Sequence, residues 1–398
     1  MMYLCYFGVK EPLVQTQVLT YLRQLAARGV AVHLLTFEPQ NLNEWSRAER
    51  EQVRNRLAAE GITWFWLRYH KRPSLVATLY DIVAGALKAA SLVRRHAIKV
   101  LHARSHVAMA MALISRRLIK TQVLFDLRGL LAEEYADAGI WARGSLPFRM
   151  VELFERSGLR KADAIVVLTR RMRDALVNTG LLRDQIVEVI PCCVDFSNFQ
   201  EIPAPSERLR FEMVYAGSVT GLYMLEEMAH FFLELKTRQP DAFFRVLTVS
   251  SAKSAASVLR KAGLSDSDCY VGAADPKEIP GYLSRARIGI SFRKPTVSQI
   301  AASPTKISEY LAAGLPVVSN AGTGDIDELF ETERVGVTLN RFDRDSYQRA
   351  VDRVLELAAE ENIRTRCRDT SVRHFDLVNV GGARYDLVYK KLQQRWIN

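Results

Sequence analysis

Two charged side chains in one short segment have the residue types and the spacing to bind a phosphorylated ligand. The segment, residues 303–318, has the sequence SPTKISEYLAAGLPVV. Lys306 falls near the start of a predicted helix, where the helix dipole favours an anion, and Glu309 lies three residues later on the same face. A phosphate ester of a sugar or nucleoside would satisfy both side chains. The alternative is that both are solvated on an ordinary surface helix.

Capping residues define the element that positions these charges. Ser303 can cap the helix, with Pro304 at the first helical position and Lys306 at the third. Gly314 is placed to end the helix before Val317 begins a buried strand. The segment is therefore predicted as a loop, a short helix, a turn and a strand.

Length and composition indicate a globular chain of two domains. The chain has 398 residues, a length greater than one hydrophobic core usually serves. Of these residues 48% are hydrophobic and 25% are charged, as in globular proteins. Strands and helices alternate along it, as in a doubly wound α/β fold. We predict a first domain over 1–195, a linker at 196–209, a second domain over 210–382 and a terminal helix, 383–398, that can pack back on the first domain.

The positive charge is concentrated in the first half of the chain. Residues 1–200 hold 28 Lys and Arg against 18 Asp and Glu, a net +10, and the remainder holds 27 against 26, a net +1. An anionic membrane surface, a phosphorylated substrate or plain solvation would each suit the basic clusters. No nucleic-acid-binding motif accompanies them, so nucleic acid is not expected as a partner.

Cysteines and the amino terminus indicate a cytoplasmic compartment. The five cysteines form no pair at zinc-binding spacing, which fits reduced thiols, and the first residues form a core strand without the basic region of a signal peptide.

The apolar segment from Leu75 to Val93 contains Asp81 and Lys88, which argues against a membrane-spanning helix. Its stripe at helical spacing is predicted to pack on a sheet, with a position on a membrane surface as the alternative. The stripe consists of Leu75, Leu79, Val83, Leu87, Ala90 and Val93.

Three blocks together resemble family 4 glycosyltransferases of the GT-B fold: IPCCVD at 190–195, YAGS at 215–218, and KISEYLAAGLPVV at 306–318. The resemblance implies two doubly wound, Rossmann-like domains facing a cleft. It implies a nucleotide-diphospho-sugar bound mainly by the second domain and an acceptor bound by the first. It also implies transfer with retention of anomeric configuration, without a metal or other cofactor, because the leaving diphosphate can accept the acceptor's proton.

The resemblance also assigns site residues. Glu309 corresponds to the family's glutamate that holds the ribose hydroxyls, and Gly217 with Ser218 matches the loop that faces the diphosphate. The first glutamate of the family is Ala301 here, and residues 219–226 lack the usual Arg and Lys. Lys306 is therefore our first choice for the missing cation, with Arg293 and Lys294, at the end of the preceding predicted strand, behind it. The predicted donor-binding set is Gly8, Gly217, Ser218, Arg293, Lys294, Ser303, Thr305, Lys306 and Glu309.

The first domain offers candidate catalytic residues at the carboxyl ends of two predicted strands. Asp126 and Arg128 follow one strand and His102 ends the one before it. We expect contacts with the acceptor or the sugar, although a histidine in a strand is also commonly structural. Asp325 and Asp327 form an Asp-x-Asp sequence, but they are expected to open a helix rather than to bind metal.

Three hypotheses follow. The first is a retaining glycosyltransferase, of hexosyltransferase type, that builds a surface polysaccharide or glycolipid. It would act on a membrane-associated glycan or lipid acceptor, in the cytoplasm or at the inner face of the plasma membrane. The second is a GT-B enzyme with nucleotide-sugar epimerase chemistry. The third is a non-catalytic nucleotide-sugar-binding partner subunit, which the absent glutamate and cations would suit. The donor base, the sugar, the acceptor and the oligomeric state stay open.

Overall fold

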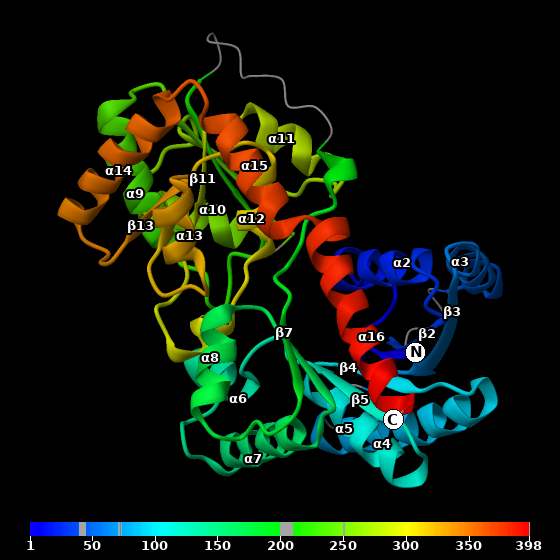
Figure 1. Ribbon diagram of the computed structural model, residues 1–398. Helices are drawn as coiled ribbons and strands as arrows, with labels where there is room; N and C mark the ends of the chain where they lie inside the picture. The colour runs from blue at the N-terminus through cyan, green and yellow to red at the C-terminus, as the bar shows by residue number, and fades with distance from the viewer. Residues whose placement is uncertain (40–44, 71, 73, 200–209, 250, 398) are drawn as a thin grey trace. The chain divides into compact units, whose positions relative to one another are not determined.

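The structure is a computed structural model that describes residues 1–39, 45–70, 72, 74–199, 210–249 and 251–397. The chain divides into two compact units, one formed by Met1–Pro191 with Leu377–Asn398 and the other by Cys192–Asp376 (Figure 1). Most of the predicted linker, 196–209, lies outside the described residues. Each unit is a parallel sheet with helices between successive strands, so the predicted fold class of two doubly wound α/β domains is confirmed.

The first unit has a seven-stranded sheet in the order β3-β2-β1-β4-β5-β6-β7. Every pairing is parallel. Because the central strands are covered on both faces, β1, β4, β5 and β6 are buried at every position. The strands are β1 (Met2–Leu4), β2 (Val32–Glu38), β3 (Ile62–Arg68), β4 (Val100–Arg104), β5 (Gln122–Asp126), β6 (Ala164–Val167) and β7 (Ile186–Val189).

Helices cover both faces of this sheet. Right-handed crossovers place α4, α5, α7 and α8 on one face and α2 and α3 on the other (Figure 1). The carboxyl-terminal helix α16 joins α2, since the ring centroids of Tyr385 and Tyr21 lie 5.4 Å apart. The helices are α1 (Pro12–Val14), α2 (Thr20–Ala27), α3 (Arg47–Ala59), α4 (Ser74–His96), α5 (Ser105–Leu118), α6 (Leu131–Asp137), α7 (Leu146–Lys161), α8 (Arg170–Asn178) and α16 (Ala383–Ile397), with π-helical turns at Gln15–Leu19 and Leu377–Gly382.

Helix α4 packs through a different face from the one predicted. Four members of the predicted buried stripe, Leu75, Leu79, Val83 and Leu87, are 50–71% exposed. Small residues face inward instead: a Cβ on Gly85 would lie 2.7 Å from the sulfur of Met111 on α5. Close approach of the two helices therefore selects the small residues for the contact and leaves the large ones outside. The prediction that these four leucine and valine side chains pack on the sheet is wrong.

The second unit has a six-stranded parallel sheet in the order β10-β9-β8-β11-β12-β13. Its strands are β8 (Glu212–Ala216), β9 (Phe243–Leu247), β10 (Cys269–Gly272), β11 (Ile288–Ser291), β12 (Val317–Asn320) and β13 (Gly336–Leu339). Its helices are α9 (Leu225–Arg238), α10 (Ala252–Lys261), α11 (Ile279–Arg285), α12 (Thr305–Ala312), α13 (Ile326–Glu333), α14 (Arg344–Ala359) and α15 (Ile363–Phe375), with 3₁₀ turns at Phe196–Asn198 and Val297–Ala301.

Candidate functional site

Helix α12 positions the two charges of the segment 303–318. The helix begins at Thr305, not at Pro304, so Lys306 is its second residue rather than its third. Ser303 does not cap it. The Ser303 hydroxyl oxygen instead accepts a hydrogen bond of 3.1 Å from the backbone N–H of Cys192, and the Ser308 hydroxyl donates to the Cys192 carbonyl at 3.2 Å. Ser303 therefore anchors the start of the helix to the segment that opens this unit. Thr305 is partly buried, and its backbone carbonyl accepts a hydrogen bond from the Ser308 hydroxyl.

The glycine loop after β8 lies directly against Lys306. Gly217 has a φ of +141°, and a Cβ added to it would stand 3.0 Å from Cε of Lys306 and 3.3 Å from its Nζ. Its N–H donates to the Leu247 carbonyl on β9 at 2.8 Å, which holds the loop in place. Glycine is needed here because both the backbone conformation and the space exclude a side chain. The neighbouring Ser218 has its hydroxyl 3.1 Å from that of Thr220.

Two cations meet around one phenol. Nζ of Lys306 lies 3.7 Å from the ring centroid of Tyr223, and the guanidinium carbon of Arg293 lies 4.8 Å from it. Burial raises the pKa of Tyr223, but the charges and hydrogen bonds of Lys306 and Arg293 outweigh it and leave that pKa below its ordinary value. Burial lowers the pKa of Lys306, whose residue is only 7% exposed. The alternative of a solvated Lys306 on a surface helix is therefore wrong.

Neutral groups, rather than carboxylates, hold Arg293 in this position. The backbone N–H of Arg293 donates a hydrogen bond to Oδ1 of Asn320 at 2.7 Å. The guanidinium Nε of Arg293 donates to Oε1 of Gln299 at 2.5 Å. In the described part of the chain, no carboxylate lies within 4.0 Å of the Lys306 or Arg293 nitrogens. The pair therefore carries positive charge that is free to balance an anion such as a phosphate. Lys294, the third cation predicted here, has an exposed side chain, and its backbone N–H donates a hydrogen bond to the Leu222 carbonyl.

Glu309 lies one turn after Lys306 on α12. Burial raises its pKa to about 7, although the charge of Lys306 acts in the opposite direction. Among the residues that the structure describes, none forms a hydrogen bond with its carboxylate. A partly buried carboxylate with free oxygens can accept hydrogen bonds from a ligand's hydroxyl groups. Gly217, Arg293, Lys306 and Glu309 are thus on adjoining elements of one site, with Ser218 and Lys294 on its loops.

The Asp-x-Asp sequence opens a helix, as predicted. Helix α13 begins at Ile326, directly after Asp325, and Oδ2 of Asp327 accepts a hydrogen bond of 2.8 Å from the N–H of Gly322. This carboxylate thus closes the glycine turn that precedes the helix. No group of three or more His, Cys, Asp or Glu residues with the geometry of a metal site occurs within the described ranges.

The candidate catalytic residues of the first unit form a buried network. Asp126 is fully buried, with its carboxylate 3.5 Å from a guanidinium nitrogen of Arg128 and 3.6 Å from Nε2 of His102. Burial raises the pKa of Asp126, but Arg128, His102 and Arg104 together bring it well below its ordinary value. Nδ1 of His102 lies 2.7 Å from the Tyr389 hydroxyl on α16, and burial lowers the pKa of His102. Of the three predicted residues, only Arg128 reaches partly out of the protein.

A buried carboxylate beside Gly8 was missed from the sequence. The backbone N–H of Val9 donates to Oε1 of Glu38 at 2.9 Å, and a Cβ on Gly8 would lie 2.9 Å from Oε2. Burial raises the pKa of Glu38. A cavity of about 140 Å³ opens here, lined by Gly8, Lys10, Glu11, Glu38, Pro39 and Trp45. The available signal was the position of Glu38 at the end of a strand next to the Gly8 loop, because parallel strands end at one edge.

Comparison with known proteins gives one domain match and a likeness in fold. Residues 14–193 match the glycosyl transferase 4-like domain. The whole chain is similar in fold to sucrose-phosphate synthase from Thermosynechococcus elongatus, with 17% identity, 99% of both chains covered and a TM-score of 0.75. The chain therefore has the two-domain fold of the GT-B glycosyltransferases and is family 4-like over residues 14–193.

Two further proteins are similar to this chain. HepE of Anabaena, solved in complex with UDP and glucose, is 13% identical, and the match covers 98% of this chain and 99% of that one with a TM-score of 0.68. A stretch of 49 residues is 47% identical to part of TuaH from Bacillus subtilis (strain 168), whose name assigns it to the glycosyltransferases of teichuronic acid biosynthesis. That stretch covers 12% of this chain and 12% of TuaH.

Proposed function

We propose that this GT-B protein transfers a sugar from a nucleotide-diphospho-sugar to a membrane-associated glycan or lipid acceptor. The observation that carries the proposal is the convergence of Lys306 and Arg293 beside Gly217, one helical turn from Glu309. A diphosphate needs cations and a backbone without side chains, and a ribose needs hydrogen-bond acceptors. All three features lie on adjoining elements here. The complex of HepE with UDP and glucose gives independent support for this donor class.

In the proposed reaction the two cations stabilise the charge that develops as the diphosphate leaves. Such fixed charges in a partly buried site lower the barrier because they need little rearrangement during the reaction. We propose transfer with retention, of hexosyltransferase type and without a metal. The departing phosphate oxygen would accept the proton of the acceptor hydroxyl on the same face of the sugar. Lys306 and Arg293 would then take the place of the family's usual Arg and Lys.

The place of the reaction is part of the same proposal. The net charge of +10 on residues 1–200 favours an anionic surface near the acceptor-binding unit, as at the inner face of a plasma membrane. The identity with TuaH supports a role in cell-surface polysaccharide synthesis, and a glycolipid product would fit the same chemistry. A nucleotide-sugar epimerase would release a changed sugar without an acceptor, and a partner subunit would bind the donor without turnover.

The first experiment is thermal-shift binding against a panel of UDP-, GDP-, ADP- and CMP-sugars. We expect an increase in melting temperature with one nucleotide class, because a ligand that binds only the native state stabilises it by mass action. Glu309→Ala should lose most of that increase, whereas Glu331→Ala, at an exposed position on α13, should keep it. No increase with any donor would contradict the proposed donor site. Donor turnover measured with excess EDTA then tests independence from metal, and product analysis separates transfer from epimerisation.

A further inference from the structure

Helix α4 carries an apolar face that the described residues of its own unit leave uncovered. Leu75, Val76, Leu79, Tyr80, Val83 and Leu87 are 50–71% exposed. At 100° per residue these six positions fall within an arc of about 140° on one side of the helix. Isolated exposed leucines are ordinary on protein surfaces, but a contiguous apolar stripe over four helical turns marks an interaction surface.

Polar groups on α4 are arranged around this stripe rather than within it. Asp81 points inward, where its carboxylate accepts hydrogen bonds from the Tyr6 hydroxyl at 2.8 Å and from the N–H of His70 at 3.0 Å. Lys88, Arg94 and Arg95 are exposed toward the carboxyl end of the helix. The exposed side of α4 therefore carries apolar and basic side chains and no acidic ones. The length and composition of Leu75–His96 would also allow a membrane span, but 44% of its most apolar stretch is buried within this unit.

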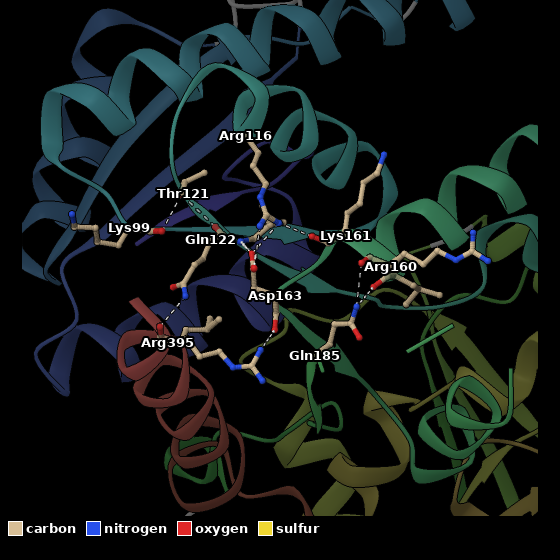
Figure 2. Close-up of polar contacts among 12 residues, drawn as sticks. Lys99, Arg116, Thr121, Gln122, Arg160, Lys161, Asp163, Gln185 and Arg395 are labelled. Atoms are coloured by element: carbon tan, nitrogen blue, oxygen red, sulfur yellow. Dashed lines mark hydrogen bonds and ion pairs between the residues drawn. The ribbon is translucent and has the colours of Figure 1, made fainter. Parts of the chain in front are cut away.

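Further basic residues lie at the ends of α5 and α7, which, like the end of α4, precede the amino ends of strands β4, β5 and β6. Helix α5 ends with Arg116 and Arg117, and α7 ends with Arg160 and Lys161. Figure 2 shows Arg116 bound to the Lys161 carbonyl at 2.6 Å and to Asp163 at 3.0 Å, which ties the ends of α5 and α7 together. Figure 2 also shows the charged ends of Arg160 and Lys161 extending away from these contacts. In the described part of the chain, no acidic side chain pairs with Lys88, Arg95 or Arg117.

We propose that α4 lies in the interface of an anionic lipid bilayer, with its apolar stripe among the acyl chains and the basic helix ends at the headgroups. An apolar face bordered by lysine and arginine suits this environment, since long basic side chains reach the headgroups while apolar ones enter the boundary region. The occupant is a bilayer rather than a second copy of the chain, because the exposed charges of α4 are all basic and two such faces would repel each other. The inference deepens the proposed membrane-associated acceptor by naming the surface that brings the protein to it.

The test is co-flotation of the full-length protein with vesicles of phosphatidylcholine alone or with phosphatidylglycerol added, without donor or acceptor. We expect the wild type to float with the anionic vesicles. The triple variant Leu79→Gln, Val83→Gln, Leu87→Gln should bind about tenfold or more weakly, because three exposed apolar side chains are lost. Leu387→Gln, at an exposed position on α16, is the matched control and should bind like the wild type. Circular dichroism of each variant confirms folding.

A second pair of measurements separates insertion from surface charge. The fluorescence of Tyr80→Trp should shift to shorter wavelength with anionic vesicles and be quenched by lipids brominated on the acyl chains. Lys88→Gln with Arg95→Gln should weaken binding to anionic vesicles and reduce its dependence on salt. Equal binding by the triple variant, no vesicle binding by the wild type, or a wild-type dimer that the triple variant abolishes would each overturn the inference. Because the donor is absent, these outcomes are independent of the thermal-shift test of the proposed function.

Discussion

Nζ of Lys306 lies 3.7 Å from the ring centroid of Tyr223, so a buried ammonium group is held over an aromatic face instead of beside a carboxylate. The ring supplies a partial negative charge that supports the cation without neutralising it. A diphosphate that enters the site would therefore meet a positive charge that is already desolvated and fixed in position. Five predictions test this arrangement and the buried network of the first unit.

Lys306→Met should separate ligand binding from folding. Methionine keeps the apolar stem and removes a buried charge, so the free energy of unfolding without ligand should stay equal or rise. Binding of the nucleoside diphosphate found in the donor panel should weaken by about tenfold or more, because a charge-assisted contact is lost. Lys294→Met, at the exposed neighbouring cation, should change binding by less than about threefold. Calorimetric titration gives the affinities, and equal losses in the two variants would contradict the assigned role of Lys306.

Gly217→Ala should weaken donor binding more than it weakens the fold. The added methyl group would stand 3.0 Å from Cε of Lys306 and displace the ammonium group from Tyr223. Gly221 is the matched control, because its φ is +75° and its Cβ would meet no atom within 4 Å. Both alanines should lower the free energy of unfolding by about 1 kcal/mol through backbone strain. Only Gly217→Ala should also lower donor affinity, and normal affinity in that variant would refute the close contact.

Glu309 should make stability depend on pH near neutrality. Its native pKa of about 7 lies above the unfolded value, so the native state holds the proton more tightly. The contribution of Glu309 to the free energy of unfolding is fully present below about pH 4 and is lost as pH rises toward 7. Relative to Glu309→Gln, the wild type should lose about 2 kcal/mol of unfolding free energy between pH 5 and pH 8. Urea denaturation at both pH values measures this difference, with Glu331→Gln as the exposed control; parallel curves for wild type and Glu309→Gln would be the contrary result.

Donor affinity of the wild type should move in the opposite direction to stability. An ionised Glu309 accepts hydrogen bonds from ribose hydroxyls better than a protonated one, so affinity should rise between pH 6 and pH 8. The same titration on Glu309→Gln should be flat across this range.

Asp126→Asn should destabilise the first unit. The carboxylate balances Arg104 and Arg128 in a buried position, and its removal leaves both guanidinium groups without a counter-charge. We expect a loss of about 3 kcal/mol of unfolding free energy at pH 7. Because the native pKa of Asp126 is depressed, its contribution is present above about pH 4 and is lost as pH falls through lower values. Asp174→Asn, with a 59% exposed side chain, should change stability by less than about 0.5 kcal/mol.

The outcome for Asp126→Asn also distinguishes two roles. If Asp126 only supports the fold, the surviving folded protein should keep its KM for the acceptor. If it positions Arg128 for the acceptor or the sugar, that KM should rise while donor affinity stays unchanged.

Local pattern was sufficient for the alternation of strands and helices and for the glycine that ends α12. These features depend on side-chain period and backbone freedom, which neighbours in sequence decide. The block around Lys306 and Glu309 also carried the family resemblance, and the resemblance led to the expectation that Lys306 and Arg293 serve one site. The start of α12 was misplaced by one residue because Ser303 found a partner in Cys192, which is distant along the chain.

Tertiary structure alone decided which atoms meet. Tyr223, Gln299 and Asn320 have no distinguishing pattern, yet they hold the two cations because β8, β11 and β12 are neighbours in the sheet. The same is true of α4, where hydrophobicity showed only that a face would be apolar. The face of α4 that is buried is the one that carries Gly85, because this glycine lets α4 approach α5 closely. The large apolar side chains remain outside. Burial is a property of the packed partners, and a single sequence does not name them.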